Sequence, residues 1–173
     1  MDIERIEEQT VEILKKNNCF TLPIEVEELA VNIGVKLEKV EVDDDVSGLF
    51  VMKKNKPYIL YNALQSTNRT RFTIAHELGH YILHSYKTPL FIDKTSKVLY
   101  RDNNSSTGEI LMEREANAFA AALLMPKSLI RNELDKKISD VDDVIQYLAD
   151  KFQVSSQAMS FRLSNLGYDF GMF

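Results

Sequence analysis

The sequence predicts an α+β fold that is mostly helical and carries a small three-stranded antiparallel sheet. Apolar residues recur at the spacing of amphipathic helices over most of the chain, but between residues 35 and 61 the period shortens to about two, which is typical of strands. The 173 residues are 45% hydrophobic and 27% charged, an ordinary composition for a globular protein of one-domain size. We therefore expect a single domain over residues 1–173.

The first third of the chain predicts two helices followed by the sheet. Pro23 suits the first turn of a helix, and Gly34 suits its C-terminal cap. Lys54-Asn55-Lys56 is a turn signal between two apolar runs, and short connections of this kind favour antiparallel hairpins. The expected elements are helices over residues 2–17 and 21–34 and strands over residues 35–42, 47–53 and 57–61.

The rest of the chain predicts helices on either side of one polar segment. A long helix is expected over residues 67–85, and residues 88–107 are irregular and polar. An Ala-rich helix over residues 109–125 follows, and Pro126 ends it. Two or three further helices are expected between residues 127 and 166.

Residues 144–167 show the pattern of helix, tight turn and helix that DNA-binding units share. Residues 127–173 hold six basic and seven acidic side chains, and the second helix of the pair offers only Arg162 as a cation. Because phosphate contacts supply most of the affinity for DNA, this surface suits DNA poorly. We expect the pair to pack on the core and do not expect direct DNA binding.

Charge and cysteine content argue against several classes of protein. The net charge is -5, whereas a general nucleic-acid binder usually has a basic surface. Cys19 is the one cysteine, so no internal disulfide can form, which fits a reducing compartment. The first residues are too charged for a signal peptide, and no apolar run approaches the ~20 residues of a membrane span. We expect a soluble cytoplasmic protein that does not bind membranes.

His76 and His80 are four residues apart in the expected long helix, so both imidazoles leave one face a turn apart. This spacing lets two nitrogens reach one zinc ion at about 2.0–2.1 Å. Glu77 lies between them and can accept a proton from a metal-bound water and pass it to a leaving amine. Gly79 leaves room for another element to pack closely against the helix. The pattern predicts a metal-dependent hydrolase.

A catalytic zinc site usually has a third protein ligand, and the residues leave several candidates. His84 lies about 80° round the helix from His76 and about 12 Å along it, so a structural role at the helix end fits it better. Glu113 faces an Ala-rich surface, where a carboxylate is costly to bury without a partner. Asn117 shares that face and could orient a histidine. The other carboxylates of this helix are Glu109, which stays a candidate, and Glu115, which we expect to be solvated.

Two stretches together resemble the ImmA/IrrE family of metallopeptidases: RFTIAHELGHYILH, from Arg71 to His84, and EREANAFAAALLMP, from Glu113 to Pro126. The resemblance implies a gluzincin-like site that holds one Zn²⁺ ion, with Glu77 as the general base. It also implies a minimal thermolysin-like core, in which the small antiparallel sheet packs on the active-site helix. The implied metal ligands are His76, His80 and Glu113.

The resemblance further implies a protein substrate, namely a helix-turn-helix repressor of a mobile element, a prophage or a stress response. In such peptidases an extended peptide pairs with an exposed sheet edge beside the metal, and the strand around residues 48–51 is the candidate edge. No motif identifies the residue that stabilises the oxyanion, for which Tyr81, Tyr86 and Tyr100 are candidates. A second interpretation stays open: a non-catalytic binding module that retains the metal site and sequesters a repressor or binds DNA.

Overall fold

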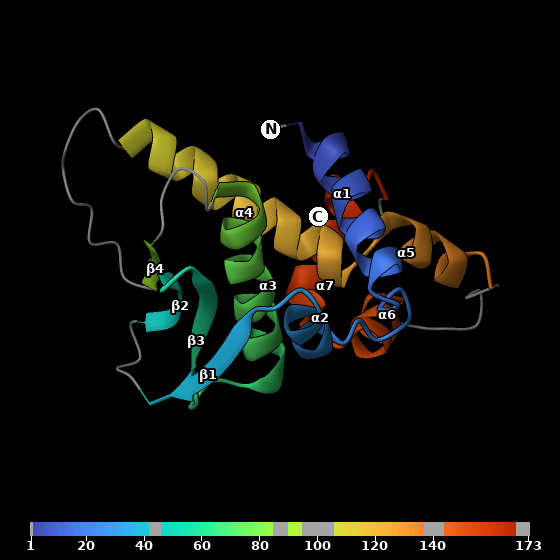
Figure 1. Cartoon of the computed structure of the whole chain (residues 1–173). Helices are drawn as coiled ribbons and strands as arrows, with labels where there is room; N and C mark the ends of the chain where they lie inside the picture. The colour runs from blue at the N-terminus through green and yellow to red at the C-terminus, as the bar shows by residue number, and fades with distance from the viewer. Residues whose placement is uncertain (1, 42–45, 85–89, 95–105, 137–143, 169–173) are drawn as a thin grey trace.

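A computed structural model describes residues 2–41, 46–84, 90–94, 106–136 and 144–168 of the protein (Figure 1). The described part contains seven helices and one four-stranded sheet. None of its helices is long and apolar enough to cross a membrane. The elements in chain order are α1 (Ile3–Lys16), α2 (Val26–Asn32), β1 (Lys36–Val40), β2 (Val46–Lys53), β3 (Lys56–Asn62), α3 (Thr67–His84), β4 (Leu90–Lys94), α4 (Ser106–Leu124), α5 (Lys127–Leu134), α6 (Val144–Phe152) and α7 (Ser156–Asn165).

The α+β architecture is as predicted, but the sheet is mixed and has a fourth strand. β2 and β3 form the expected antiparallel hairpin, in which Lys54 and Asn55 take the positive φ values that a tight hairpin turn requires. β1 does not pair with β2. It lies on the far side of β3 and runs parallel to it, from Lys36 opposite Tyr58 to Val40 opposite Asn62. The prediction of a purely antiparallel sheet is wrong for this pair.

β4 lies within the stretch that the sequence predicts to be irregular, and it takes the other side of β2. The two strands are antiparallel, with Phe50 opposite Phe91. The strand order is therefore β1-β3-β2-β4, and the outer strands are β1 and β4. The expectation that β2 offers an exposed edge is wrong, because β4 already pairs with the backbone of residues 48–51.

α2 begins at Val26, later than the sequence predicts, because the preceding residues have other partners. The side chain of Ile24 is fully buried, and its carbonyl accepts a hydrogen bond of 2.8 Å from Nη2 of Arg71. The predicted end of the helix is confirmed, since Gly34 follows it with a φ of +83°.

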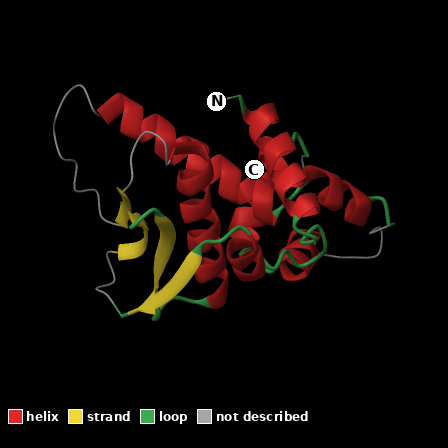
Figure 2. Cartoon of the chain, in the orientation of Figure 1, coloured by secondary structure: helices red, strands yellow, loops and turns green. Residues whose placement is uncertain are grey.

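α3 is the central element of the molecule. Figure 1 and Figure 2 show the sheet on one side of this helix and most of the other helices on its opposite side. α3 packs against β2 and β3 as well as against α2 and α4. Its middle turns are buried all round, which explains why the sequence shows little amphipathic character there.

α3 and α4 pack closely at Gly79, as the sequence predicts for this glycine. A methyl group at residue 79 would lie 3.0 Å from Cα of Ala116 and 3.2 Å from Cβ of Phe119. The small side chains at 79 and 116 therefore let the two helix backbones come nearly into contact. Phe119, Leu78 and Leu123 fill the space beside this crossing and are fully buried.

Two buried arginines tie the C-terminal helix pair to the rest of the chain. Arg71 of α3 donates from Nε to the carbonyl of Gln153, in the turn between α6 and α7, at 3.2 Å. Arg162 of α7 donates from Nε to the carbonyl of Met125 at 3.0 Å and from Nη2 to Glu7 at 2.8 Å. Arg162 is only 6% exposed, so the one cation of α7 is engaged within the fold.

We predict that Gly79→Ala lowers the free energy of unfolding by about 1–3 kcal/mol, because the added methyl group must push α4 away from α3. Urea unfolding followed by circular dichroism measures the change. Gly108→Ala is the matched control, since its methyl group meets nothing within 4 Å. That substitution should be neutral or stabilising by up to about 1 kcal/mol. Equal stability of Gly79→Ala and wild type would contradict the close crossing.

Candidate metal centre

Three side chains from α3 and α4 converge on one point. Nε2 of His76 lies 3.0 Å from Nε2 of His80. The carboxylate of Glu113 completes the group, with Oε2 3.3 Å from His76 Nε2 and Oε1 3.1 Å from His80 Nε2. Both imidazoles are almost fully buried, whereas the carboxylate side chain is 46% exposed. The crossing at Gly79 brings Glu113 within reach of the two histidines.

The spacing of these donor atoms fits a tetrahedral metal ion. Ligands about 2.0–2.1 Å from a zinc ion lie about 3.3–3.4 Å from one another at the corners of a tetrahedron. The three measured separations run from 3.0 to 3.3 Å. Two imidazoles and one carboxylate are also a donor set of catalytic zinc sites, in which water takes the fourth position. These atoms could therefore hold one metal ion.

Hydrogen bonds at the opposite ring nitrogens leave Nε2 of both histidines available to a metal. Nδ1 of His76 lies 3.1 Å from Oδ1 of Asn117, and a carbonyl oxygen only accepts, so the proton of this ring is assigned to Nδ1. Nδ1 of His80 lies 3.4 Å from Nδ1 of His84. The bare Nε2 atoms then present lone pairs to one another and to Glu113, an arrangement that calls for a cation between them. Asn117 thus contacts a histidine as the sequence suggests.

The electrostatics of Glu113 reflect the same convergence. Burial alone raises the pKa of this carboxyl group, because the charged form loses water. When no metal holds the two Nε2 atoms, these can carry protons instead of lone pairs. Hydrogen bonds from His76 and His80, together with their positive charge, then outweigh burial and lower the pKa from 4.5 to about 2. Glu113 is therefore a carboxylate at neutral pH, which is the form that binds metal.

Glu77 lies beneath β2 and is fully buried. A methyl group at Gly48 would lie 2.5 Å from Cγ2 of Thr73 and 3.0 Å from Oε1 of Glu77. The bare backbone of Gly48 is thus what allows β2 to pass directly over this carboxylate. Glu77 follows His76 in α3, so this fully buried carboxylate lies on the same helix as both donor histidines.

The structure separates the other candidates for a third ligand from the donor group. His84 lies behind His80, with Nε2 2.9 Å from Oε2 of Glu115. Glu109 is exposed near the start of α4. The expectation that Glu115 is solvated is wrong, because its side chain is only 12% exposed. α3 passes so close to α4 that both Glu113 and Glu115 reach its histidines.

One of the three tyrosines considered for the oxyanion can be placed. The ring of Tyr81 packs against Phe50 of β2, with centroids 5.5 Å apart, and the tyrosine is partly buried. Tyr86 and Tyr100 lie outside the described residues. The assignment of this role therefore remains a prediction.

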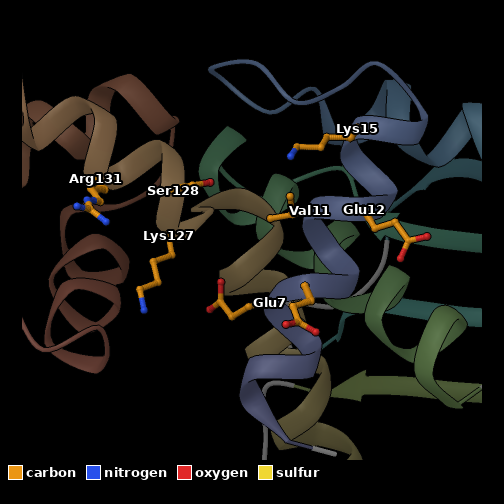
Figure 3. A pocket seen from close by; sticks show the side chains of 8 residues that line it. Glu7, Val11, Glu12, Lys15, Lys127, Ser128 and Arg131 are labelled. Atoms are coloured by element: carbon orange, nitrogen blue, oxygen red, sulfur yellow. The ribbon is translucent and has the colours of Figure 1, made fainter.

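Two recesses of the described part differ in their relation to the candidate centre. One recess has a volume of about 420 Å³, and its lining includes Phe72, Val154, Ala158 and the exposed Phe161. The ring of Phe72 stacks on His76 with centroids 6.5 Å apart. The other, of about 670 Å³, lies between α1 and α5 (Figure 3). Its lining carries charges of both signs, and none of the donor residues contributes to it. The recess beside Phe72 is the one next to the candidate centre.

Comparison with protein-family models identifies the chain. Residues 29–164 match the model described as the IrrE N-terminal-like domain, peptidase family M78. The match includes α3, α4 and the three donor residues. The chain belongs to this family. The resemblance to ImmA and IrrE that the two sequence stretches suggest is thereby confirmed.

Curated relatives within the family are named as metallopeptidases. The metallopeptidase ImmA of Bacillus subtilis is 29% identical over 121 residues, which cover 70% of this chain and 64% of ImmA. The radiation response metalloprotease IrrE of Deinococcus radiodurans is 30% identical over 106 residues, which cover 61% of this chain and 30% of IrrE. The chain therefore aligns with less than two thirds of the length of either relative.

The fold is also found in a solved structure of a transcriptional regulator from Mycobacterium tuberculosis. The superposition covers 93% of this chain and 46% of that protein, with a TM-score of 0.65 and 16% sequence identity. At this identity the likeness extends to the fold alone.

We predict that Glu113 makes the metal-free protein sensitive to acid. Its pKa is lowered on folding, so its carboxylate stabilises the fold above about pH 4.5, and this contribution is lost as pH falls toward 2. Urea unfolding of wild type and Glu113→Gln, both with chelator, should show a stability difference that changes over this pH range. Glu109→Gln, an exposed substitution on the same helix, is the control and should follow wild type. A difference independent of pH would contradict the assignment.

Proposed function

We propose that this chain is a zinc-dependent endopeptidase of the cytoplasm that cleaves a regulatory protein. The observation that carries the proposal is the convergence of His76, His80 and Glu113, with the buried carboxylate of Glu77 on the same helix as the two histidines. The membership of the chain in a peptidase family and the names of its relatives support it. In this proposal the three converging residues hold one zinc ion.

Zinc bound there would polarise the scissile carbonyl group and acidify a water molecule. Glu77 is proposed to accept the proton of that water on its carboxylate and to deliver it to the leaving amine. Its burial under Gly48 supports this role, because a carboxylate shielded from bulk water passes its proton to the substrate rather than to solvent. Asn117 is proposed to hold His76 in the orientation that presents Nε2 to the metal.

The proposed substrate is a helix-turn-helix repressor of a mobile element, a prophage or a stress response. This part of the proposal rests on the resemblance to ImmA and IrrE. A substrate strand that pairs directly with β2 would need the place that β4 holds, so we no longer assign substrate pairing to β2. The recess lined by Phe72, whose ring stacks on His76, is proposed to receive an apolar side chain of the substrate.

A non-catalytic module that sequesters a repressor is the alternative, and it would retain the same donor residues. DNA binding by the C-terminal helices receives no support from Arg162, because this side chain is buried against Glu7 and Met125. Catalysis and sequestration are distinguished by Glu77, which a binding module does not require for its effect.

We predict that Glu77→Gln abolishes cleavage and retains the metal. The amide is close in size to the carboxylate but cannot accept the proton, so turnover should fall by about 10²–10⁴-fold. The measurement is incubation of the zinc-loaded protein with purified helix-turn-helix repressors from the same genome, followed by mass spectrometry of the products. Metal content of both proteins is measured in parallel.

Three comparisons complete this experiment. A chelator should stop cleavage by the wild type, and added zinc should restore it. Glu109→Gln, which removes an exposed carboxylate outside the donor group, should cleave as the wild type does. An effect on the repressor that persists in Glu77→Gln would exclude the peptidase and favour sequestration.

A further inference from the structure

A second line of buried polar groups runs behind the donor histidines and ends in a carboxylate. Oε2 of Glu115 lies 2.9 Å from Nε2 of His84, and Nδ1 of His84 lies 3.4 Å from Nδ1 of His80. His80 and His84 are each only 1% exposed, and the Glu115 side chain is 12% exposed. The function proposed above uses neither His84 nor Glu115.

The hydrogen-bonding capacity of these groups, with His84 neutral, assigns the positions of their protons. A carboxylate accepts hydrogen bonds only, so the proton between His84 and Glu115 belongs to Nε2 of His84. Nδ1 of a neutral His84 then carries a lone pair and accepts from the N–H at Nδ1 of His80. This direction leaves Nε2 of His80 without a proton, on the side where His76 and Glu113 lie.

The opposite direction of the hydrogen bond between His80 and a neutral His84 would be unfavourable. If His84 carried its proton on Nδ1, two N–H groups would face each other across 3.4 Å, and a bare Nε2 would face the carboxylate of Glu115 at 2.9 Å. Both contacts would be repulsive in a buried place, where polar groups without a suitable partner are costly. Between the two neutral forms of His84, Glu115 therefore selects the one with its proton on Nε2.

We propose that His84 and Glu115 are positioning residues, which hold His80 in the ring orientation and protonation that present Nε2 to the metal. The proposal rests on the metal site proposed above and adds two residues behind it. Carboxylates and other acceptors behind a ligating histidine commonly orient it, and their loss commonly lowers metal affinity about 10–100-fold. Here His84 lies between the ligating His80 and the carboxylate of Glu115.

The first test is the affinity for zinc, measured on full-length protein by competition with a chromophoric chelator. Glu115→Ala and His84→Leu should each weaken binding about 10–100-fold. Glu115→Gln, whose amide oxygen can still accept from His84, should recover most of the affinity. The double variant His84→Leu with Glu115→Ala should bind no more weakly than His84→Leu, because the two residues act through one contact. Glu109→Ala, on the same helix, should bind as the wild type does.

The second test determines by NMR which ring nitrogens of His80 and His84 carry protons. Long-range ¹H–¹⁵N correlation spectra of the zinc-loaded wild type should show a protonated Nδ1 in His80, a bare Nδ1 in His84 and a protonated Nε2 in His84. In Glu115→Ala the signals of His84 should become those of a mixture of tautomers. A protonated Nδ1 in His84 of the wild type would overturn the proposal.

The outcomes separate this proposal from the proposed function. A wild type that binds no zinc would remove the metal site itself. A wild type that binds zinc, with Glu115→Ala and His84→Leu of unchanged affinity, would overturn only the positioning role. A merely structural role would lower the urea stability of the metal-free variants and leave the zinc affinity of the folded protein unchanged. If His84→Leu fails to fold, the comparison of Glu115→Ala with Glu115→Gln decides alone.

Discussion

The close crossing of α3 and α4 at Gly79 is the constraint on which the rest of the centre depends. α3 supplies two imidazoles and the buried carboxylate, and α4 supplies Glu113, so no three-donor group exists until the helices meet. The absence of a side chain at residue 79, opposite Ala116, permits that meeting. Because Glu113 and Glu115 lie three residues and one residue before Ala116 in α4, the same contact brings one carboxylate to the donor group and the other to His84.

The sheet packs against the opposite side of α3, where a glycine again permits the close contact. Gly48 lets β2 pass over Glu77 without a side chain between the strand and the carboxylate. α3 is therefore fixed from both sides by glycine contacts, one to a strand and one to a helix. A rigid helix of this kind holds donor atoms more accurately than a loop could, since its side chains have few rotamers open to them. Donor separations close to those of a tetrahedral site follow from this rigidity.

Two arginines determine how the C-terminal helices relate to this centre. Arg71 and Arg162 are buried and donate mostly to backbone carbonyls, which ties the turn between α6 and α7 to α3 and ties α7 to the end of α4. The helix pair therefore serves as a wall of the same hydrophobic core, with Phe152 and Met159 fully buried in it. The recess beside Phe72 exists because α7 is held against the start of α3.

The sequence by itself determined what depends on one helix or one turn. The rotation and rise of an α-helix set His76 and His80 on one face with Glu77 between them, and Gly34 and Lys54-Asn55 marked their turns, because these features involve neighbours in the chain. Only the tertiary structure decided which carboxylate of α4 meets the histidines and whether Glu115 is buried. Only it decided that β1 pairs with β3 and that β4 covers β2. The physical reason is that strand pairing and helix packing depend on where a segment distant in sequence lies. The periodicity of one helix or strand shows which of its faces is apolar but not which other element packs against that face.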